Sequence, residues 1–130
     1  AIRRDLVRAA VLVRRRWRVR LPATVSVVFV GPAESRSLKR RFLKQDRAAN
    51  VLSFRYNGEG EIILTPAVIR REARRGEARY PIRLRRMAVH GLLHLVGQHH
   101  EPSAAAARRF ERREAELLRH LGLAADVVPR

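Results

Sequence analysis

The sequence predicts an α+β domain in which a small mixed sheet packs against helices. Apolar stripes at helical spacing alternate with short β-branched runs along the chain. With 130 residues, 46% of them hydrophobic, the chain is long enough to bury one core, which predicts a single domain over residues 1–130. Cysteine is absent, so the sequence offers no disulfide partner and no thiolate ligand for a metal.

The first third of the chain is expected to form a helix, a strand and a second helix. The first helical stripe contains Ile2, Leu6, Ala9, Val13 and Trp17. The β-branched run 23–30 ends at Gly31-Pro32, which indicates a strand followed by a turn. A second helix is expected from Glu34 to about Lys44. Its inward-facing side chains would be Leu38, Phe42 and Leu43.

Two further strands are expected to form a hairpin. Residues 51–56 and 61–65 are rich in β-branched, aromatic and aliphatic side chains, and they flank the connection 57–60. That connection begins with Asn57-Gly58, a pair that suits a tight turn because both residues tolerate a positive φ.

Three helices are expected to complete the fold. The first spans about residues 66–75 and ends at Gly76, the second spans about 82–96, and the third spans about 103–121 with Ser103 as its N-cap. We expect the helix at 82–96 to be central, and residues 122–130 to be a frayed tail. The core residues of the last two helices would be Met87, Leu92, Leu93, Val96, Phe110, Leu117, Leu118 and Leu121.

The densest chemical signal is a run of histidines. Residues 90–100 read His-Gly-Leu-Leu-His-Leu-Val-Gly-Gln-His-His and hold four of the five histidines. His90 and His94 are four residues apart and therefore project from one face of a helix. Gly97 is expected to end that helix, so that the chain turns back and His100 supplies a third nitrogen. Three imidazoles with a fourth position open are typical of catalytic zinc.

The same run departs from the zinc peptidases at one position. It matches the long zincin motif H-E-x-x-H-x-x-G-x-x-H except that Gly91 replaces the glutamate. A peptidase of that class needs this carboxylate to activate its zinc-bound water, so the pattern predicts different chemistry on the same metal. The alternative is that His90 and His94 are ordinary helix histidines satisfied by local hydrogen bonds.

The other two histidines have less definite roles. His99 is a candidate to replace His100 as ligand, to hydrogen-bond a ligand, to carry a proton, or simply to face solvent. His120 lies near the end of the last helix, where its position favours an interaction with the helix dipole.

The charge points to a polyanionic partner. Lys and Arg number 29 against 12 Asp and Glu, for a net charge of +17, and the lysines are Lys39 and Lys44 alone. Guanidinium groups bind phosphate oxygens in pairs, so this composition favours RNA or DNA as partner; the alternative is a solvated arginine shell. The sequence shows no transmembrane or secretory segment, which predicts a cytoplasmic protein without a membrane partner.

Three segments together resemble a known family. The His-Gly-x-Leu-His-Leu-x-Gly-x-x-His run, the segment Asn50-Val51-Leu52-Ser53-Phe54 and the segment Gly60-Glu61-Ile62-Ile63-Leu64 resemble the YbeY family of bacterial endoribonucleases and rRNA maturation factors. The resemblance spans about residues 38–101. It implies a zincin-like α+β fold with Zn2+ bound by His90, His94 and His100. It also implies cleavage of single-stranded RNA in small-subunit rRNA maturation and ribosome quality control.

The chain departs from the family pattern at three places. Gln98-His99 replaces a Tyr-Asp pair, Ala48-Ala49 replaces a Pro-Thr pair, and Leu43 replaces an arginine that the family uses for catalysis. The cations available nearby to replace that arginine are Arg41, Lys44, Arg47 and Arg55.

The leading hypothesis is metal-dependent hydrolysis of an RNA phosphodiester by an endoribonuclease. Its candidate catalytic residues are His99 as proton carrier and Arg41 and Arg47 as cations that neutralise charge in the transition state. Ser53 is expected to be structural or a substrate contact, since no histidine–acid pair is assignable to it. The alternatives are a non-catalytic rRNA- or ribosome-binding module with a structural zinc, and a zinc peptidase.

Overall fold

The computed structural model describes residues 1–76, 78–96 and 103–124. Within these ranges the chain forms five helices and three strands. In chain order they are α1 (Ile2–Trp17), β1 (Thr24–Phe29), α2 (Pro32–Leu43), β2 (Val51–Tyr56), β3 (Glu59–Leu64), α3 (Pro66–Arg74), α4 (Tyr80–Leu95) and α5 (Ala104–His120). The predicted α+β class is therefore confirmed, and each predicted element is present with shifts of a few residues at its ends.

The described strands form one mixed sheet in the order β1-β3-β2. β1 runs parallel to β3, and β2 runs antiparallel to it. The predicted hairpin joins β2 to β3 through Asn57-Gly58, whose φ angles of 51° and 79° are both positive, as a type I′ turn requires. β3 begins at Glu59, two residues earlier than the alternation suggested.

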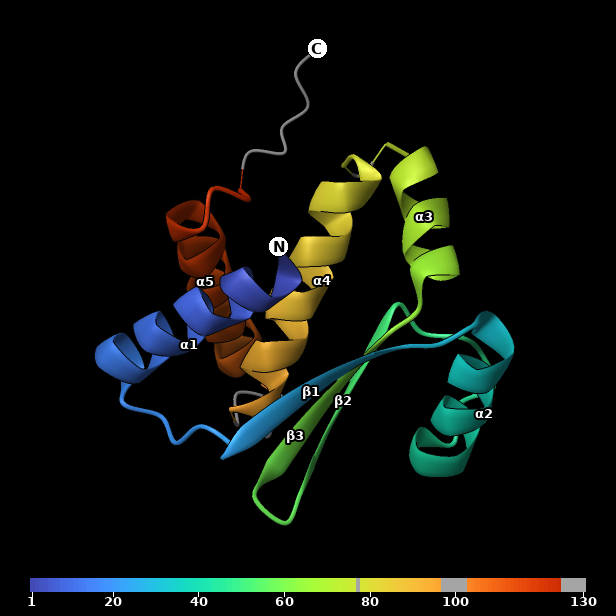
Figure 1. Ribbon diagram of the computed structural model, residues 1–130, viewed down its shortest axis with the longest axis horizontal. Coiled ribbons are helices and arrows are strands. Elements are labelled where there is room, and N and C mark those ends of the chain that lie inside the picture. Colours follow the sequence, from blue (N-terminus) through green and yellow to red (C-terminus); the bar gives the residue numbers. More distant parts are fainter. Residues whose placement is uncertain (77, 97–102, 125–130) are drawn as a thin grey trace.

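Helices cover both faces of the sheet. Successive side chains of β3 point to opposite faces, so Ile62 and Leu64 join the main core with α1, α4 and α5, whereas Ile63 joins a smaller cluster toward α2. In Figure 1, α4 stands between α3 on one side and α1 with α5 on the other. The prediction of a central α4 is confirmed, with Met87, Leu92, Leu93 and Val96 all buried.

A buried ion pair joins the first helix to the central one. Asp5 of α1 is fully buried, and Arg85 of α4 donates to both of its carboxylate oxygens, at 2.6 and 2.9 Å. Such a bidentate pair fixes the orientation of both side chains. It therefore helps to hold α1 in place on α4.

The structure corrects the expectation for the end of α2. Phe42 and Leu43 were predicted to face inward, but they are 55% and 49% exposed. The side of the sheet that α2 covers offers only a small apolar cluster, which Leu38 is sufficient to cover. Phe42 instead places its ring 5.3 Å from that of Phe54 on β2.

The expectation of a frayed tail is wrong for its first residues. Leu123 is 1% exposed and belongs to the main core. Arg86 of α4 donates hydrogen bonds to the carbonyl oxygens of Leu123 and Ala124, at 2.7 and 3.0 Å. Residues 125–130 lie outside the described residues. No helix in the described ranges has the length and apolar character needed to cross a membrane.

Candidate metal centre

Two histidines of α4 face each other across one helical turn. The Nε2 atoms of His90 and His94 are 3.1 Å apart, and their ring centroids are 4.7 Å apart. Two imidazole nitrogens that share a tetrahedral zinc at about 2.0–2.1 Å lie roughly 3.3 Å from each other, so the spacing fits a shared cation. The predicted placement of this pair on one helix face is what the structure shows.

A carboxylate from α5 fixes the orientation of one of these rings. The Nδ1 atom of His90 lies 2.7 Å from Oε2 of Glu114, and about a quarter of each side chain is exposed (29% for His90, 20% for Glu114). Because an ionised carboxylate only accepts, Nδ1 carries the hydrogen of this bond. In the neutral ring the lone pair is then on Nε2, which faces His94. Histidines that bind metals commonly donate their other nitrogen to a carboxylate in this way.

An aromatic ring from α5 packs against both imidazoles. The centroid of Phe110 lies 5.2 Å from that of His90 and 4.7 Å from that of His94. Phe110 and Glu114 are four residues apart, so one face of α5 presents an apolar contact and a hydrogen-bond acceptor to the same pair. The contact between the two Nε2 atoms and the one between Nδ1 of His90 and Glu114 also fit the alternative of helix histidines satisfied by hydrogen bonds, so the bound metal stays a prediction.

The remaining predicted residues of the histidine run lie outside the described residues. These are Gly97, His99 and His100, and also Gln98. Within residues 1–76, 78–96 and 103–124 there is no group of three or more metal-binding side chains. The donor set that the structure describes is therefore His90 and His94, and the third ligand stays a prediction.

The structure explains why a glycine follows the first histidine. Gly91 is buried, and a Cβ at this position would lie 2.8 Å from Cγ2 of Ile62 and 3.0 Å from Oγ of Ser53. The helix face next to His90 is thus pressed against the sheet, with no space for the zincin glutamate. Ser53 donates its hydroxyl to the carbonyl oxygen of Gly91 at 2.8 Å, which agrees with the structural role predicted for it.

The candidate cations differ in where they lie. Arg55 donates from Nη1 to the carbonyl oxygen of Leu95 at 2.8 Å, so its guanidinium lies at the end of α4, one residue beyond His94. Arg41 lies over the ring of Phe42 on the α2 side of the sheet, and Arg47 hydrogen-bonds to Gln45 at 3.3 Å. Neither has a hydrogen bond to α4 within the described ranges.

The loop that carries the family departures contains a charge network. Asp46 accepts hydrogen bonds from Arg36 at 2.8 and 3.0 Å and from Arg40 at 3.1 Å. The hydrogen bonds from Arg36, together with the charges of both guanidiniums, lower the pKa of Asp46 to about 2. Two of the nearby arginines are thus occupied by this acid.

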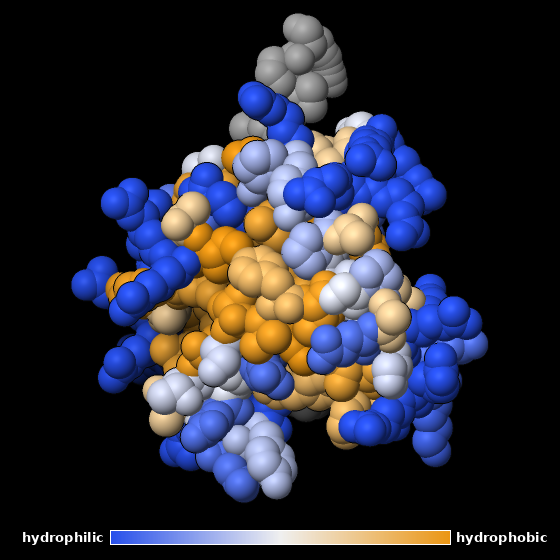
Figure 2. Space-filling view, turned by 45° about the vertical axis from the view of Figure 1, so that its right-hand side comes forward, coloured by the Kyte–Doolittle hydropathy of each residue, from blue (hydrophilic) through white to orange (hydrophobic). Residues whose placement is uncertain are grey.

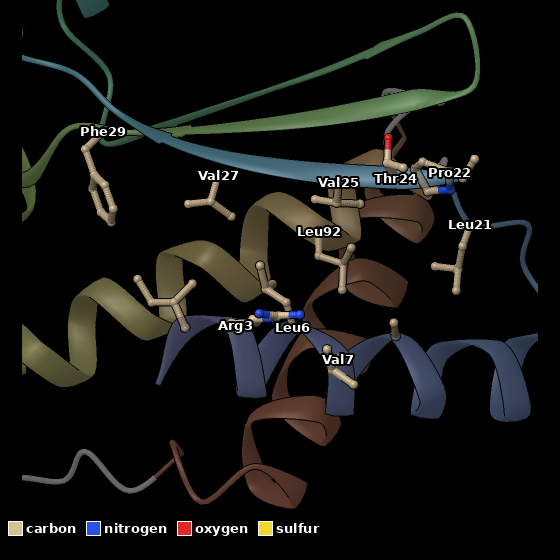
Figure 3. Close-up of a pocket in the computed structure, with 13 residues that line it drawn as sticks. Arg3, Leu6, Val7, Leu21, Pro22, Thr24, Val25, Val27, Phe29 and Leu92 are labelled. Atoms are coloured by element: carbon tan, nitrogen blue, oxygen red, sulfur yellow. The ribbon is translucent and has the colours of Figure 1, made fainter.

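A cavity between β1 and α1 is lined by residues other than the histidines. It measures about 690 Å³, and Figure 3 shows Val25, Val27 and Phe29 of β1 above Leu6 and Val7 of α1. Figure 2 shows a broad hydrophobic area on one face of the molecule, framed by hydrophilic side chains. The charged residue that lines the cavity is Arg3, and no lining residue is a histidine or an acid. We therefore assign no reaction to it.

Sequence reasoning missed Glu114 as a member of the site and treated Phe110 only as core. A signal was present: Glu114 is on the side of the helix that carries Phe110, Leu117 and Leu121, where a carboxylate has no reason to be unless it has a partner.

Comparisons with known proteins agree with the fold and the motifs. The family model described as Endoribonuclease YbeY matches residues 2–122. A protein of Methylibium petroleiphilum named Endoribonuclease YbeY is 39% identical over 126 residues, which is 94% of this chain and 84% of that protein. A protein of the same name from an Acidovorax species is 35% identical over 128 residues, which is 95% of this chain and 84% of that protein. The solution structure of TM1509 from Thermotoga maritima has a TM-score of 0.62 at 22% identity, and the alignment covers 98% of this chain and 89% of that one.

Proposed function

The chain belongs to the YbeY endoribonuclease family, and we propose that it is a zinc-dependent endoribonuclease that cleaves single-stranded rRNA. The proposal includes a role in maturation and quality control of the small ribosomal subunit, in the cytoplasm. The observation that carries it is the distance of 3.1 Å between the Nε2 atoms of His90 and His94, together with the hydrogen bond between Nδ1 of His90 and Glu114.

The residues that would hold zinc are His90, His94 and, from the sequence that follows α4, His100. When bound, zinc would polarise a phosphoryl oxygen and supply a water of lowered pKa. Glu114 keeps the hydrogen of His90 on Nδ1, so that Nε2 is available as a donor to a metal. Phe110 packs against both rings on the α5 side.

The positive charge needed near a cleaved phosphodiester would come from arginine. Arg55 is best placed to do this among the described candidates, because it is hydrogen-bonded to the last turn of the helix that carries His94. Arg41 and Arg47 keep their proposed role as cations, but as contacts to more distant phosphates on the α2 side. His99 stays the proposed proton carrier.

The decisive test uses protein whose zinc content has been measured. Wild type and His94→Ala are incubated with a single-stranded rRNA-derived oligonucleotide, with and without a chelator. We expect cleavage by the wild type alone, lost on chelation, because His94 supplies one of two described donors. His120→Ala is the matched control, since His120 lies at the far end of α5 from Phe110 and should leave cleavage unchanged.

One observation favours a second candidate function. Leu43, which replaces the arginine of the family, is 49% exposed at the end of α2 and offers no charge to a substrate. A non-catalytic rRNA-binding module with structural zinc would show this loss. No cleavage by fully zinc-loaded wild type, together with a lower melting temperature for His94→Ala, would favour this module over the nuclease.

A further inference from the structure

The outer side of α5 and the end of α1 enclose a groove that the histidine site does not use. Its volume is about 530 Å³. We call it the arginine groove, and its chief lining residues are Trp17, Arg109, Arg112, Arg113, Glu116 and Arg119. The two helices are tied along its length by an ion pair of Arg16 with Glu116 and by a hydrogen bond from Arg8 to the carbonyl oxygen of His120.

Three arginines of this groove, Arg109, Arg112 and Arg119, have no carboxylate partner among the described residues. The described lining contains one carboxylate, Glu116, and Arg16 of α1 already occupies it. Arg109, Arg112 and Arg119 are exposed and have no ion pair within the described residues. Arg36 and Arg40, by contrast, share Asp46 as their counterion.

One guanidinium of the groove is partly buried and has two other arginines nearby. Arg113 lies over the ring of Trp17, 4.9 Å from its centroid. Burial, together with the charges of Arg109 and Arg112, lowers the pKa of Arg113. An anion in the groove would relieve this repulsion and would stabilise the charged form of each arginine.

We propose that the arginine groove binds backbone phosphates of RNA on the outer side of α5, the helix whose inner side packs against the histidines of α4. The inference rests on the proposed function, because it names where an RNA substrate extends beyond the cleavage site. Phe110 and Glu114 face the histidines, whereas Arg109, Arg112 and Arg119 project from the opposite side of α5. A helix with its side chains is about 10–12 Å across, so a strand in the groove passes about that far from His90 and His94.

The groove fits RNA better than an anionic membrane. Its guanidinium groups can form paired hydrogen bonds to phosphate oxygens of either partner. A helix that lies on a membrane, however, also inserts apolar side chains. Leu117 of α5 and Leu121, which caps the helix, are instead in the protein core, at 1% and 4% exposure. No large apolar side chain on the described length of α5 is exposed.

The test measures how salt affects the binding of a single-stranded RNA of about 20 nucleotides. The variant Arg109→Gln/Arg112→Gln/Arg119→Gln is compared with wild type by fluorescence anisotropy, in chelator so that no RNA is cut. On single strands the slope of log affinity against log salt is about −0.7 for each phosphate contacted. Loss of three contacts should therefore make the slope shallower by about 2.

A control variant with the same change of charge separates a local contact from the total charge. Arg71→Gln/Arg74→Gln/Arg75→Gln removes three exposed arginines of α3 and of the turn that follows it. It should keep the wild-type slope. Equal slopes in wild type and the groove variant, or equal losses in both triple variants, would overturn the proposal. The single substitutions Arg109→Gln and Arg119→Gln, each with a change of about 0.7, serve if the triple variant folds poorly.

Two further measurements separate the partners and the two proposals. Binding to vesicles that contain phosphatidylserine, if lost in the groove variant while its RNA slope stays wild type, would assign the groove to lipid instead and overturn the proposal. Cleavage of a long RNA should show a raised KM with an unchanged kcat in the groove variant. Because the anisotropy measurement needs no cleavage, failure of the nuclease proposal would leave the binding result interpretable.

Discussion

The two sides of α5 meet their partners in different ways. On the inner side, Glu114 holds His90 at 2.7 Å and Phe110 packs on both histidine rings. On the outer side, Arg109, Arg112 and Arg119 extend into a groove without an ion pair in the described part of the chain. One helix thus carries a site with fixed contacts on one side and a surface of uncompensated charge on the other.

The difference follows from what each ligand requires. A metal site works only if its donor atoms are held within about 0.5 Å of their productive positions, so each ring needs neighbours that fix it. Attraction of a phosphate chain is long-ranged and tolerates mobile side chains, so charge and access are sufficient. Substitutions on the inner side should therefore change metal affinity, and those on the outer side should change the salt dependence of RNA binding.

The largest expected effect is a loss of metal affinity without any change in the salt dependence of RNA binding. His94→Ala removes one of the two converging nitrogens, so we expect zinc binding at the wild-type level to be lost while the salt slope for RNA stays unchanged. Competition with a chromophoric chelator measures the first and anisotropy the second. Zinc affinity equal to that of wild type would show that the His90–His94 pair is not the metal site.

A smaller loss of zinc affinity is expected when Glu114, which hydrogen-bonds to the ligand His90, is substituted. Glu114→Gln keeps a carbonyl oxygen near Nδ1 of His90 but removes the charge, and we expect zinc affinity to fall by about 10- to 100-fold. Glu111→Gln on the exposed side of the same helix is the matched control. If the two variants lose the same affinity, Glu114 does not position the ligand. Melting of the metal-free proteins shows whether any loss is only one of stability.

The inner side was predictable from the sequence only where its contacts are local. The spacing of four between His90 and His94 fixes their relation within one helix, and Asn57-Gly58 fixes its turn, so both predictions are confirmed. Glu114 acts on His90 across 24 positions of sequence, and no local pattern encodes that contact. The carboxylate among the core residues of α5 was a hint that lacked a partner.

The error at the end of α2 has a related cause. Phe42, four residues after Leu38, lies on the same side of α2, whereas Leu43, five residues after it, lies about 140° around the helix. What the sequence does not give is how much surface the sheet offers to α2. The small cluster that it presents is covered by Leu38, and the next turn of α2 extends past it.

The close packing behind the histidines supplies a third prediction. A methyl group on Gly91 would meet the buried Ile62 at 2.8 Å, and overpacking of this kind costs about 1–3 kcal/mol, against about 1 kcal/mol gained from the better helix propensity of alanine. Gly91→Ala should therefore lower the free energy of unfolding by up to about 2 kcal/mol. Gly31→Ala, where a methyl group would meet nothing within 4 Å, adds no overpacking and should cost only the N-cap preference for glycine at the start of α2, below about 1 kcal/mol. Urea unfolding of both variants measures the difference, and equal stabilities would show that α4 can move away from the sheet.

The smallest effect concerns a surface charge that, unlike the arginine groove, has its counterions in the protein. The pKa of Asp46 is lowered from 3.8 to about 2 in the folded chain, chiefly by the hydrogen bonds from Arg36. A lowered pKa favours the folded state above pH 4, and this contribution is lost as the pH falls from about 4 through 2. Wild type should therefore melt at a slightly higher temperature than Asp46→Asn at pH 5. The difference should shrink as the pH falls from about 4 through 2, and also in high salt, because the pair is exposed.

Substitution of Arg36 tests whether this pH-dependent difference in melting temperature comes from the Arg36–Asp46 ion pair. In an Arg36→Gln background, the change Asp46→Asn should shift the melting temperature less than it does in wild type, because the main cause of the lowered pKa is gone and only Arg40 remains. A pH-dependent difference of the same size in both backgrounds would mean that the network around Asp46 is not held by Arg36. The arginines near Leu43 would then be as available to RNA as those of the arginine groove, and the two surfaces would have to be tested as one.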